Sequence, residues 1–134
     1  MKRLFFIIPI LLCILFSACG ENNEEIANGD GVMYQQITQE EAKKIMDSGE
    51  EIIIPDVREQ DEFDEGHIPG ALLLPYTEIE NNAEGLLPDK DKLILVYCRS
   101  GRRSKIAAEA LAKLGYTNVK EFGGIIDWKY EVVK

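Results

Sequence analysis

Apolar and polar positions divide the chain into three parts. Residues 4–18 form a continuous apolar stretch, residues 21–33 are polar and acidic without any period, and from residue 34 onward short apolar runs alternate with amphipathic segments. An acidic, glycine-containing stretch without periodicity is typical of a flexible tether. We therefore expect a tether at residues 19–33 and one folded domain at residues 34–134, long enough to bury a modest core.

Short apolar runs within the folded part predict the strands. They lie at residues 34–37, 51–54, 70–74, 93–97 and 119–122. The run at 51–54 is rich in β-branched residues and lacks alternation, as expected of a strand covered on both faces. The run at 93–97, LILVY, is the most apolar, so we expect it at the centre of the sheet.

Two segments carry helical signals. Thr38 and Glu41 form a capping-box pattern that starts a helix ended by Gly49. The longest predicted helix covers residues 104–114 and ends at Gly115. Its expected buried side consists of Ile106, Ala107, Ala110, Leu111 and Leu114. Weaker signals predict a short helix at 77–82 and a closing helical turn at 125–130.

Strands that alternate with helices favour an α/β fold. The expected architecture is a mostly parallel central sheet with helices on both faces. Ligands of such sheets bind beyond the carboxyl ends of the strands. Cys98 directly follows the 93–97 run, so it should lie at that edge of the sheet.

The N-terminus has the features of an export signal. Lys2 and Arg3 precede an apolar stretch that is too short to span a bilayer comfortably. The small residues before Cys19 resemble the lipobox of bacterial lipoproteins, although Phe16 stands where leucine is usual. We therefore expect a lipoprotein signal peptide at residues 1–18 and lipidation of Cys19. An uncleaved signal anchor and an ordinary signal peptide are the alternatives.

Charge bears on partners and location. The 15 basic and 24 acidic residues of the whole chain become 13 and 24 once Lys2 and Arg3 leave with the signal, a net charge of −11. This charge excludes a nucleic-acid binder and does not favour an anionic membrane surface. Membrane attachment is then expected through the lipid, which makes the protein an extracytoplasmic, membrane-anchored lipoprotein of the cell envelope.

Three cysteines occur in the chain, and they have different expected fates. Cys13 leaves with the signal and Cys19 is lipidated, so Cys98 is the single free thiol and has no partner for an internal disulfide. His67 is the only histidine and no second sulfur remains, so we predict no metal and no other cofactor. A lone cysteine can equally be a small buried hydrophobe, and this alternative stays open here.

The five residues after Cys98 predict an anion site. They are Arg99, Ser100, Gly101, Arg102 and Arg103. A tight loop here would point its N–H groups at its own centre, and Gly101 permits the backbone conformation that such a loop needs. Converging N–H groups and a helix N-terminus favour a bound anion and a thiolate. The pattern therefore indicates a nucleophilic sulfur that faces a negatively charged ligand, with the solvated start of a helix as the alternative.

Four motifs follow one another through the folded part. They are DVRE at 56–59, GHIPGA at 66–71, YCRSGRRS at 97–104, and FGG at 122–124 followed by Trp128. In this order they resemble the single-domain rhodanese-like sulfurtransferases. The resemblance implies that Cys98 attacks the outer sulfur of an anionic, thiosulfate-like donor and holds it as a persulfide. The sulfur then passes to cyanide or to a thiol, and a thioredoxin-like protein is one such acceptor.

The resemblance also assigns roles to other residues. Residues 99–103 would surround the transferred sulfur, while Asp56, Arg58 and Ser104 would support the site. Glu62 is a candidate partner for Arg58. His67 is implied to be a packing and turn residue, and Trp128 is expected to fill the core rather than bind a ligand.

Two other function classes compete with sulfur transfer. Cysteine phosphatases and arsenate reductases need arginine at the seventh position of the loop, where this chain has Ser104, and phosphatases usually have histidine where Tyr97 stands. The loop is thus one residue too short for a tetrahedral phosphate. The second alternative is a non-catalytic binding or regulatory module that retains the fold and holds an anion.

Overall fold

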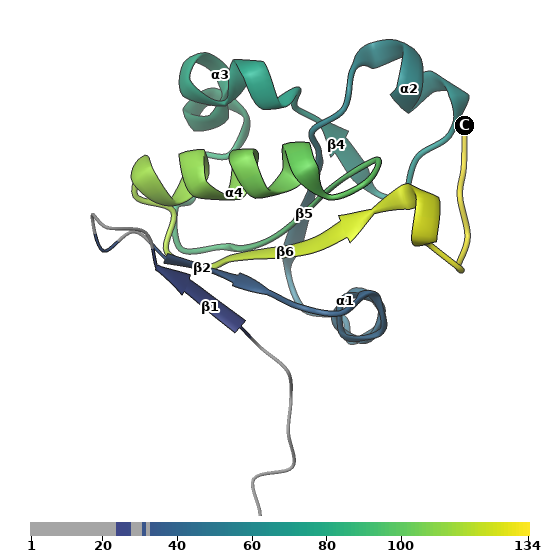
Figure 1. Ribbon diagram of the computed structural model, residues 1–134, viewed down its shortest axis with the longest axis horizontal. Helices are drawn as coiled ribbons and strands as arrows, with labels where there is room; N and C mark the ends of the chain where they lie inside the picture. The colour runs from purple at the N-terminus through teal and green to yellow at the C-terminus, as the bar shows by residue number, and fades with distance from the viewer. Residues whose placement is uncertain (1–23, 28–30, 32) are drawn as a thin grey trace, which may run out of the picture.

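The computed structural model describes residues 24–27, 31 and 33–134 (Figure 1). The predicted signal peptide, the predicted lipidation site Cys19 and tether residues 20–23, 28–30 and 32 lie outside this part of the chain. Within it, no helix is both long and apolar enough to cross a membrane.

Six strands form one sheet in the order β1-β2-β6-β5-β3-β4. Their bounds are β1 Glu24–Ala27, β2 Met33–Gln36, β3 Ile52–Asp56, β4 Ala71–Leu73, β5 Leu93–Cys98 and β6 Val119–Gly124. The pairings from β2 through β4 are parallel, and β1 pairs with β2 in the antiparallel direction. The prediction of a mostly parallel sheet is confirmed.

Strand β5 lies at the centre, between β6 and β3, as its apolar sequence predicts. All six of its residues are buried. Successive side chains of a strand point to opposite faces, so Ile94, Val96 and Cys98 enter one core cluster while Leu93, Leu95 and Tyr97 enter the other. Cys98 therefore has its side chain on the same face as Val96.

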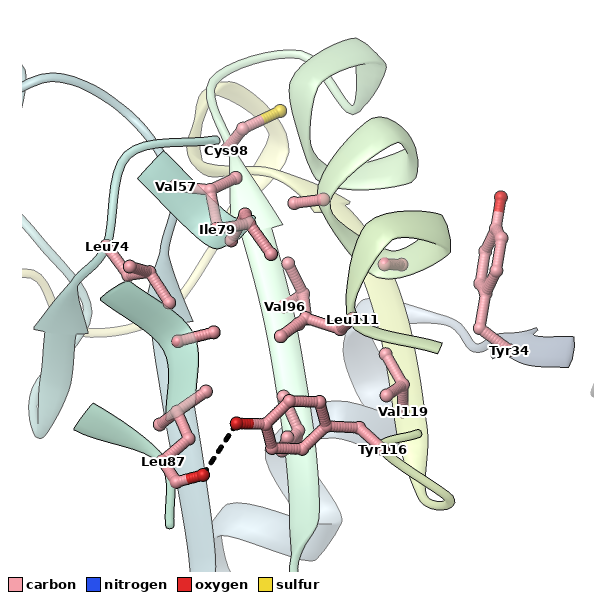
Figure 2. Packing of buried hydrophobic residues seen from close by; sticks show 14 residues of the cluster. Tyr34, Val57, Leu74, Ile79, Leu87, Val96, Cys98, Leu111, Tyr116 and Val119 are labelled. Carbon is pink, nitrogen blue, oxygen red and sulfur yellow. Dashed lines mark hydrogen bonds between the residues drawn. The ribbon is translucent and has the colours of Figure 1, made fainter. Parts of the chain in front are cut away.

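Helices cover both faces of the sheet, as predicted (Figure 1). Their bounds are α1 Gln39–Asp47, α2 Gln60–Glu65, α3 Ile79–Leu86 and α4 Arg102–Lys113, with 3-10 turns η1 Tyr76–Glu78 and η2 Ile125–Asp127. Helices α3 and α4 cover the face that carries Cys98, and α1 lies on the other face. Beneath α4, the Tyr116 hydroxyl donates to the Leu87 carbonyl at 2.6 Å and closes the far end of this core (Figure 2).

Helix α4 differs from its prediction in its start and in one residue of its expected buried side. It begins at Arg102 rather than at residue 104, and Ile106, expected on the buried side, is 44% exposed. The buried stripe consists of Ser104, Ala107, Ala108 and Leu111. This spacing of three and four residues is regular, but its first member is polar and its middle members are small. Of the predicted buried side, Ala107 and Leu111 are buried and Ala110 and Leu114 pack against the core, so only Ile106 was placed wrongly.

Two elements were absent from the sequence prediction. Strand β1 lies inside the segment expected to be a tether, where Ile26 pairs with Tyr34 and packs against the core. Helix α2 has the sequence QDEFDE, which shows no apolar period, and its start is fixed by a capping box between Glu59 and Glu62. Because α2 is polar throughout most of its length, the sequence shows no apolar pattern from which this helix could be predicted. The helix predicted at 77–82 is split into η1 and the longer α3.

Candidate active site

Cys98 is the last residue of β5 and lies beside the N-terminal turn of α4 (Figure 2). The residue is fully buried. Three residues connect it to α4, and the last of them, Gly101, has a φ of 102°. This left-handed conformation suits glycine, and it turns the Gly101 N–H toward the Cys98 sulfur, to which it donates at 3.0 Å. The tight loop predicted from the sequence is therefore present.

The start of α4 adds to the positive field at the sulfur. The Lys105 N–H closes the first turn by donating to the Gly101 carbonyl at 3.3 Å. The N–H groups of residues 102–104 precede this bond, so they lack acceptors within the helix and favour an anion. Around them the side chains of Arg99, Ser100 and Arg102 are exposed. The predicted binding loop thus presents backbone donors inside and cationic side chains outside.

Gly124 allows this loop to cross the end of β6. A side-chain carbon on Gly124 would lie 1.9 Å from the Arg99 carbonyl oxygen and 2.5 Å from the Ser100 nitrogen. The same carbonyl accepts a hydrogen bond from the Ile126 N–H at 3.1 Å. The FGG motif is therefore a site of close backbone approach, which holds the loop against the sheet.

Arg103 is held by Glu62, although the sequence suggested Arg58 as the partner of that carboxylate. The two side chains form a bidentate pair with N–O distances of 2.7 and 2.8 Å. The prediction was wrong because Arg58 is already paired within its own strand-end motif, and because Glu62 lies on the unpredicted helix α2. The hydrogen bonds that Arg103 donates lower the pKa of Glu62 to about 2, and the same bonds raise the pKa of Arg103.

This pair should make stability depend on pH. The folded pKa of Glu62, about 2, is below its ordinary value of 4.5. Its contribution is therefore present above about pH 4.5 and is lost as the pH falls toward 2. We expect Glu62→Gln to reduce the free energy of unfolding by about 1–2 kcal/mol at pH 7. This loss lies between those typical of exposed and of buried ion pairs. Urea unfolding from pH 7 to pH 3 should show this difference shrinking.

The exposed carboxylate of Glu84, paired with Lys90 at 3.0 Å, offers a matched control. Glu84→Gln should change the unfolding free energy by less than about 0.5 kcal/mol. A loss in Glu62→Gln that stays constant from pH 7 to pH 3 would show that the pair contributes nothing through charge.

Asp56 and Arg58 form a buried network that reaches Tyr97. The Arg58 side chain donates to both Asp56 oxygens, at 2.9 Å to Oδ1 and 2.6 Å to Oδ2. The Tyr97 hydroxyl donates to Asp56 at 2.5 Å and accepts from the Ile68 N–H at 3.1 Å. Arg58 also donates to the Gly66 carbonyl at 2.7 Å. The network joins three of the sequence motifs and anchors the residue that precedes Cys98.

Burial and then the Asp56 charge raise the pKa of Tyr97, so its hydroxyl stays protonated and can donate. Tyr97 directly precedes the cysteine, at the position where phosphatases usually have histidine. Its hydroxyl has a supporting role in the hydrogen-bond network rather than a chemical one. The Asp56–Arg58 pair lies where the sequence motif put it, and the hydroxyl of Tyr97 is the member that sequence reasoning missed.

His67 and Trp128 make packing contacts. The His67 ring stacks on Phe63 with centroids 3.8 Å apart, and its Nδ1 lies 3.0 Å from the Phe63 carbonyl. The His67 backbone pairs with Val133. Trp128 packs against Phe122 with ring centroids 5.6 Å apart. These contacts agree with the packing roles expected of both residues.

Ser104 connects the sulfur to a buried carboxylate. Its hydroxyl oxygen lies 3.4 Å from the Cys98 sulfur and 2.6 Å from Glu121 Oε1. Both Ser104 and Glu121 are buried. Glu121 was not among the predicted site residues, and its one signal was an acidic side chain within the apolar run before Gly123 and Gly124.

Comparison with known proteins places this site in a family. The rhodanese-like domain family matches residues 38–131. The thiosulfate sulfurtransferase PspE of Escherichia coli is 37% identical over 79 residues, covering 59% of this chain and 76% of that protein. The thiosulfate sulfurtransferase GlpE of Coxiella burnetii is 37% identical over 99 residues, covering 73% of this chain and 90% of that protein.

A solved structure of a rhodanese with anions from E. coli is also similar. It superposes with a TM-score of 0.59 at 34% identity, over 63% of this chain and 99% of that one. The family match includes the Cys98 loop, the Asp56 network and the crossing at Gly124. The sequence motifs, the fold and these relatives together show that the chain belongs to the rhodanese-like family of sulfurtransferases.

Proposed function

We propose that the protein takes a sulfane sulfur from an anionic, thiosulfate-like donor, holds it as a persulfide on Cys98, and passes it to cyanide or a thiol. The observation that carries the proposal is the position of the Cys98 sulfur. It is the acceptor of the Gly101 N–H at the base of a three-residue loop, beside a helix N-terminus. Relatives that carry the name thiosulfate sulfurtransferase support the choice of donor.

The proposed reaction has two balanced displacements. The Cys98 thiolate attacks the outer sulfur of thiosulfate, a sulfur–sulfur bond forms, and the bond to the sulfonate sulfur breaks. Sulfite leaves with the electron pair, and the negative charge on the enzyme now rests on the outer sulfur of the persulfide. Cyanide or an acceptor thiolate then attacks that outer sulfur and releases the Cys98 thiolate. Backbone N–H groups stabilise the anionic sulfur at each stage.

Burial of the thiol and the shortness of the loop support sulfur transfer over phosphate chemistry. The sulfur is fully buried, so contact with it requires a single terminal atom of the donor rather than a whole tetrahedral group. Arg103, the loop residue closest to the phosphatase position, is bound to Glu62. Its charge acts on the sulfur, while Glu62 accepts one hydrogen bond from each of its two terminal nitrogens.

The kinetic test is thiocyanate formation from thiosulfate and cyanide. Wild-type protein should turn over, and Cys98→Ser should lose essentially all activity because a serine hydroxyl cannot hold the sulfane sulfur. Ser48→Ala, which changes an exposed side chain at the end of α1 away from the loop, serves as a control and should retain the wild-type rate. Thiosulfate binding without turnover, equal in wild type and Cys98→Ala, would indicate a binding module instead.

We also propose that the protein acts outside the cytoplasm as a lipoprotein, with thiol-bearing proteins of thioredoxin type among its acceptors. Support comes from the basic residues, apolar stretch and Cys19 at the N-terminus. Cys19→Ala should move the protein from the membrane fraction to the soluble fraction of the cell envelope. An unchanged distribution would contradict lipid anchoring.

A further inference from the structure

Glu121 is a buried carboxylate that the reaction as described leaves without a role. It is 2% exposed and lies on β6. Its Oε1 accepts from the Ser104 hydroxyl at 2.6 Å and from the Gly123 N–H at 2.8 Å, and its Oε2 accepts from the Gln36 amide at 3.3 Å. Within the described residues no lysine or arginine forms an ion pair with it. A buried carboxylate without a cation is costly, which makes a functional role for it worth testing.

The Ser104 hydroxyl has one proton, and the geometry indicates where it points. Three acceptors lie within reach, at 2.6 Å for Glu121 Oε1, 2.9 Å for the Gly101 carbonyl and 3.4 Å for the Gly123 carbonyl. The charged and nearest acceptor forms the strongest bond, so the proton points to Glu121. The oxygen lone pairs are then free to accept from the Cys98 thiol at 3.4 Å. Cys98, Ser104 and Glu121 form a continuous hydrogen-bonded chain.

We propose that Glu121 accepts the proton of the Cys98 thiol through the Ser104 hydroxyl. The S–H bond breaks as a new O–H bond forms on Ser104, and the original Ser104 O–H bond breaks as one forms on Glu121. No other reactant is needed, and the net charge of the buried group is unchanged. The negative charge moves from the carboxylate to the sulfur, where the Gly101 N–H and the α4 N-terminus stabilise it. The use of this thiolate in catalysis rests on the proposed sulfur transfer.

Other ionisable groups lie around the hydrogen-bonded chain of Cys98, Ser104 and Glu121, on the side that faces solvent. Tyr34 comes from β2, and burial followed by the Glu121 charge raises the pKa of Tyr34. A groove of about 820 Å³ runs past Glu121 and gives its proton a route to solvent. The charged residues that line the groove are Glu40, Lys105, Asp127 and Lys129, while Arg103 acts on the sulfur from α4. Glu121 does not touch the sulfur, so it is a positioning residue that acts through Ser104.

The rate of Cys98 alkylation by iodoacetamide, measured on the full chain from pH 5 to pH 10, tests the proposal. The proposal predicts a plateau in the wild-type rate across the neutral range, because the thiol proton moves to Glu121 and need not be released to solvent. Glutamine at 121 keeps an oxygen for Ser104 and Gly123 but takes no proton. In Glu121→Gln the thiol proton must be released to solvent, so the rate should fall by up to about tenfold per pH unit as the pH is lowered.

The two profiles should differ by roughly 10²-fold near pH 6 and converge above pH 9. Ser104→Ala removes the middle member of the hydrogen-bonded chain and should give the same profile as Glu121→Gln, so the test does not depend on both variants folding well. The double variant should be no slower than the slower single variant, because both changes interrupt one path. Glu40→Gln removes a charge from the same groove and should retain the wild-type plateau.

Two results would overturn the proposal. Faster alkylation in Glu121→Gln at every pH would mean that the carboxylate opposes the thiolate by its charge. Parallel profiles in wild type and Glu121→Gln, even with lower thermal stability, would mean that Glu121 is structural. The assay needs no sulfur donor, so a protein that forms no thiocyanate can still pass it, and the failure of one proposal is distinguishable from the failure of the other.

Discussion

Replacing Gly124 with alanine should reduce kcat/KM for thiocyanate formation by about 10²-fold or more. The added carbon would lie 1.9 Å from the Arg99 carbonyl oxygen and 2.2 Å from its carbon, so the loop must move by more than 1 Å. Both contacts are to backbone, which cannot rotate away as a side chain can. A displacement of this size at a reacting centre lowers the rate about 10²-fold, because the N–H donors around the sulfur no longer point at it.

Gly85 is the matched control for this substitution. It lies in α3, has no atom within 4 Å of an added side-chain carbon, and does not have a positive φ. Gly85→Ala should leave the rate unchanged and stabilise the protein slightly, since alanine is favoured over glycine in helices. A Gly124→Ala protein with the wild-type rate would show that the loop does not depend on its contact with β6.

Replacing Asp56 with alanine should lower the free energy of unfolding by about 3–5 kcal/mol, the range for breaking a buried ion pair by removing one partner. Asp56 is fully buried and Arg58 is 5% exposed. The substitution leaves the guanidinium without its carboxylate and the Tyr97 hydroxyl without its acceptor. Urea unfolding measures the loss, and the fall in activity should follow the fraction of folded protein.

An exposed pair provides the comparison. Asp47 binds Lys43 at 2.6 Å on the surface of α1, and Asp47→Ala should cost less than about 0.5 kcal/mol. The double variant Asp56→Ala, Arg58→Met should be less destabilised than Asp56→Ala alone, because it leaves no buried charge unpaired. Equal losses for Asp56→Ala and Asp47→Ala would contradict the view that the Asp56 network holds the strand ends together.

The fold was predictable where burial is continuous along the sequence. The run at 93–97 becomes the central strand because a strand with neighbours on both sides and helices on both faces must be apolar throughout. Helix α4 and most of its buried side were predictable, but Ser104 and Ala108 were missed because one is polar and the other is small. Close helix packing selects small side chains, and their signal in a sequence is weak.

The site was predictable as far as local sequence determines it. The position of Cys98, the short loop and the left-handed Gly101 follow from a strand, a glycine and a helix start in succession. The partners of these residues come from distant segments. Glu62 is 41 residues from Arg103 and Glu121 is 17 residues from Ser104, and no local periodicity links them. Such pairs become visible only when the sheet brings the segments together.

The central claim is that Cys98 carries the transferred sulfur, and the mass of the protein tests it most directly. After incubation with thiosulfate and removal of the excess, the intact protein should gain the mass of one sulfur atom. Peptide mapping should place that sulfur on Cys98, and cyanide should remove it as thiocyanate. Cys98→Ser should gain nothing. A wild-type protein that gains no sulfur, or a gain that persists in Cys98→Ser, would contradict the account.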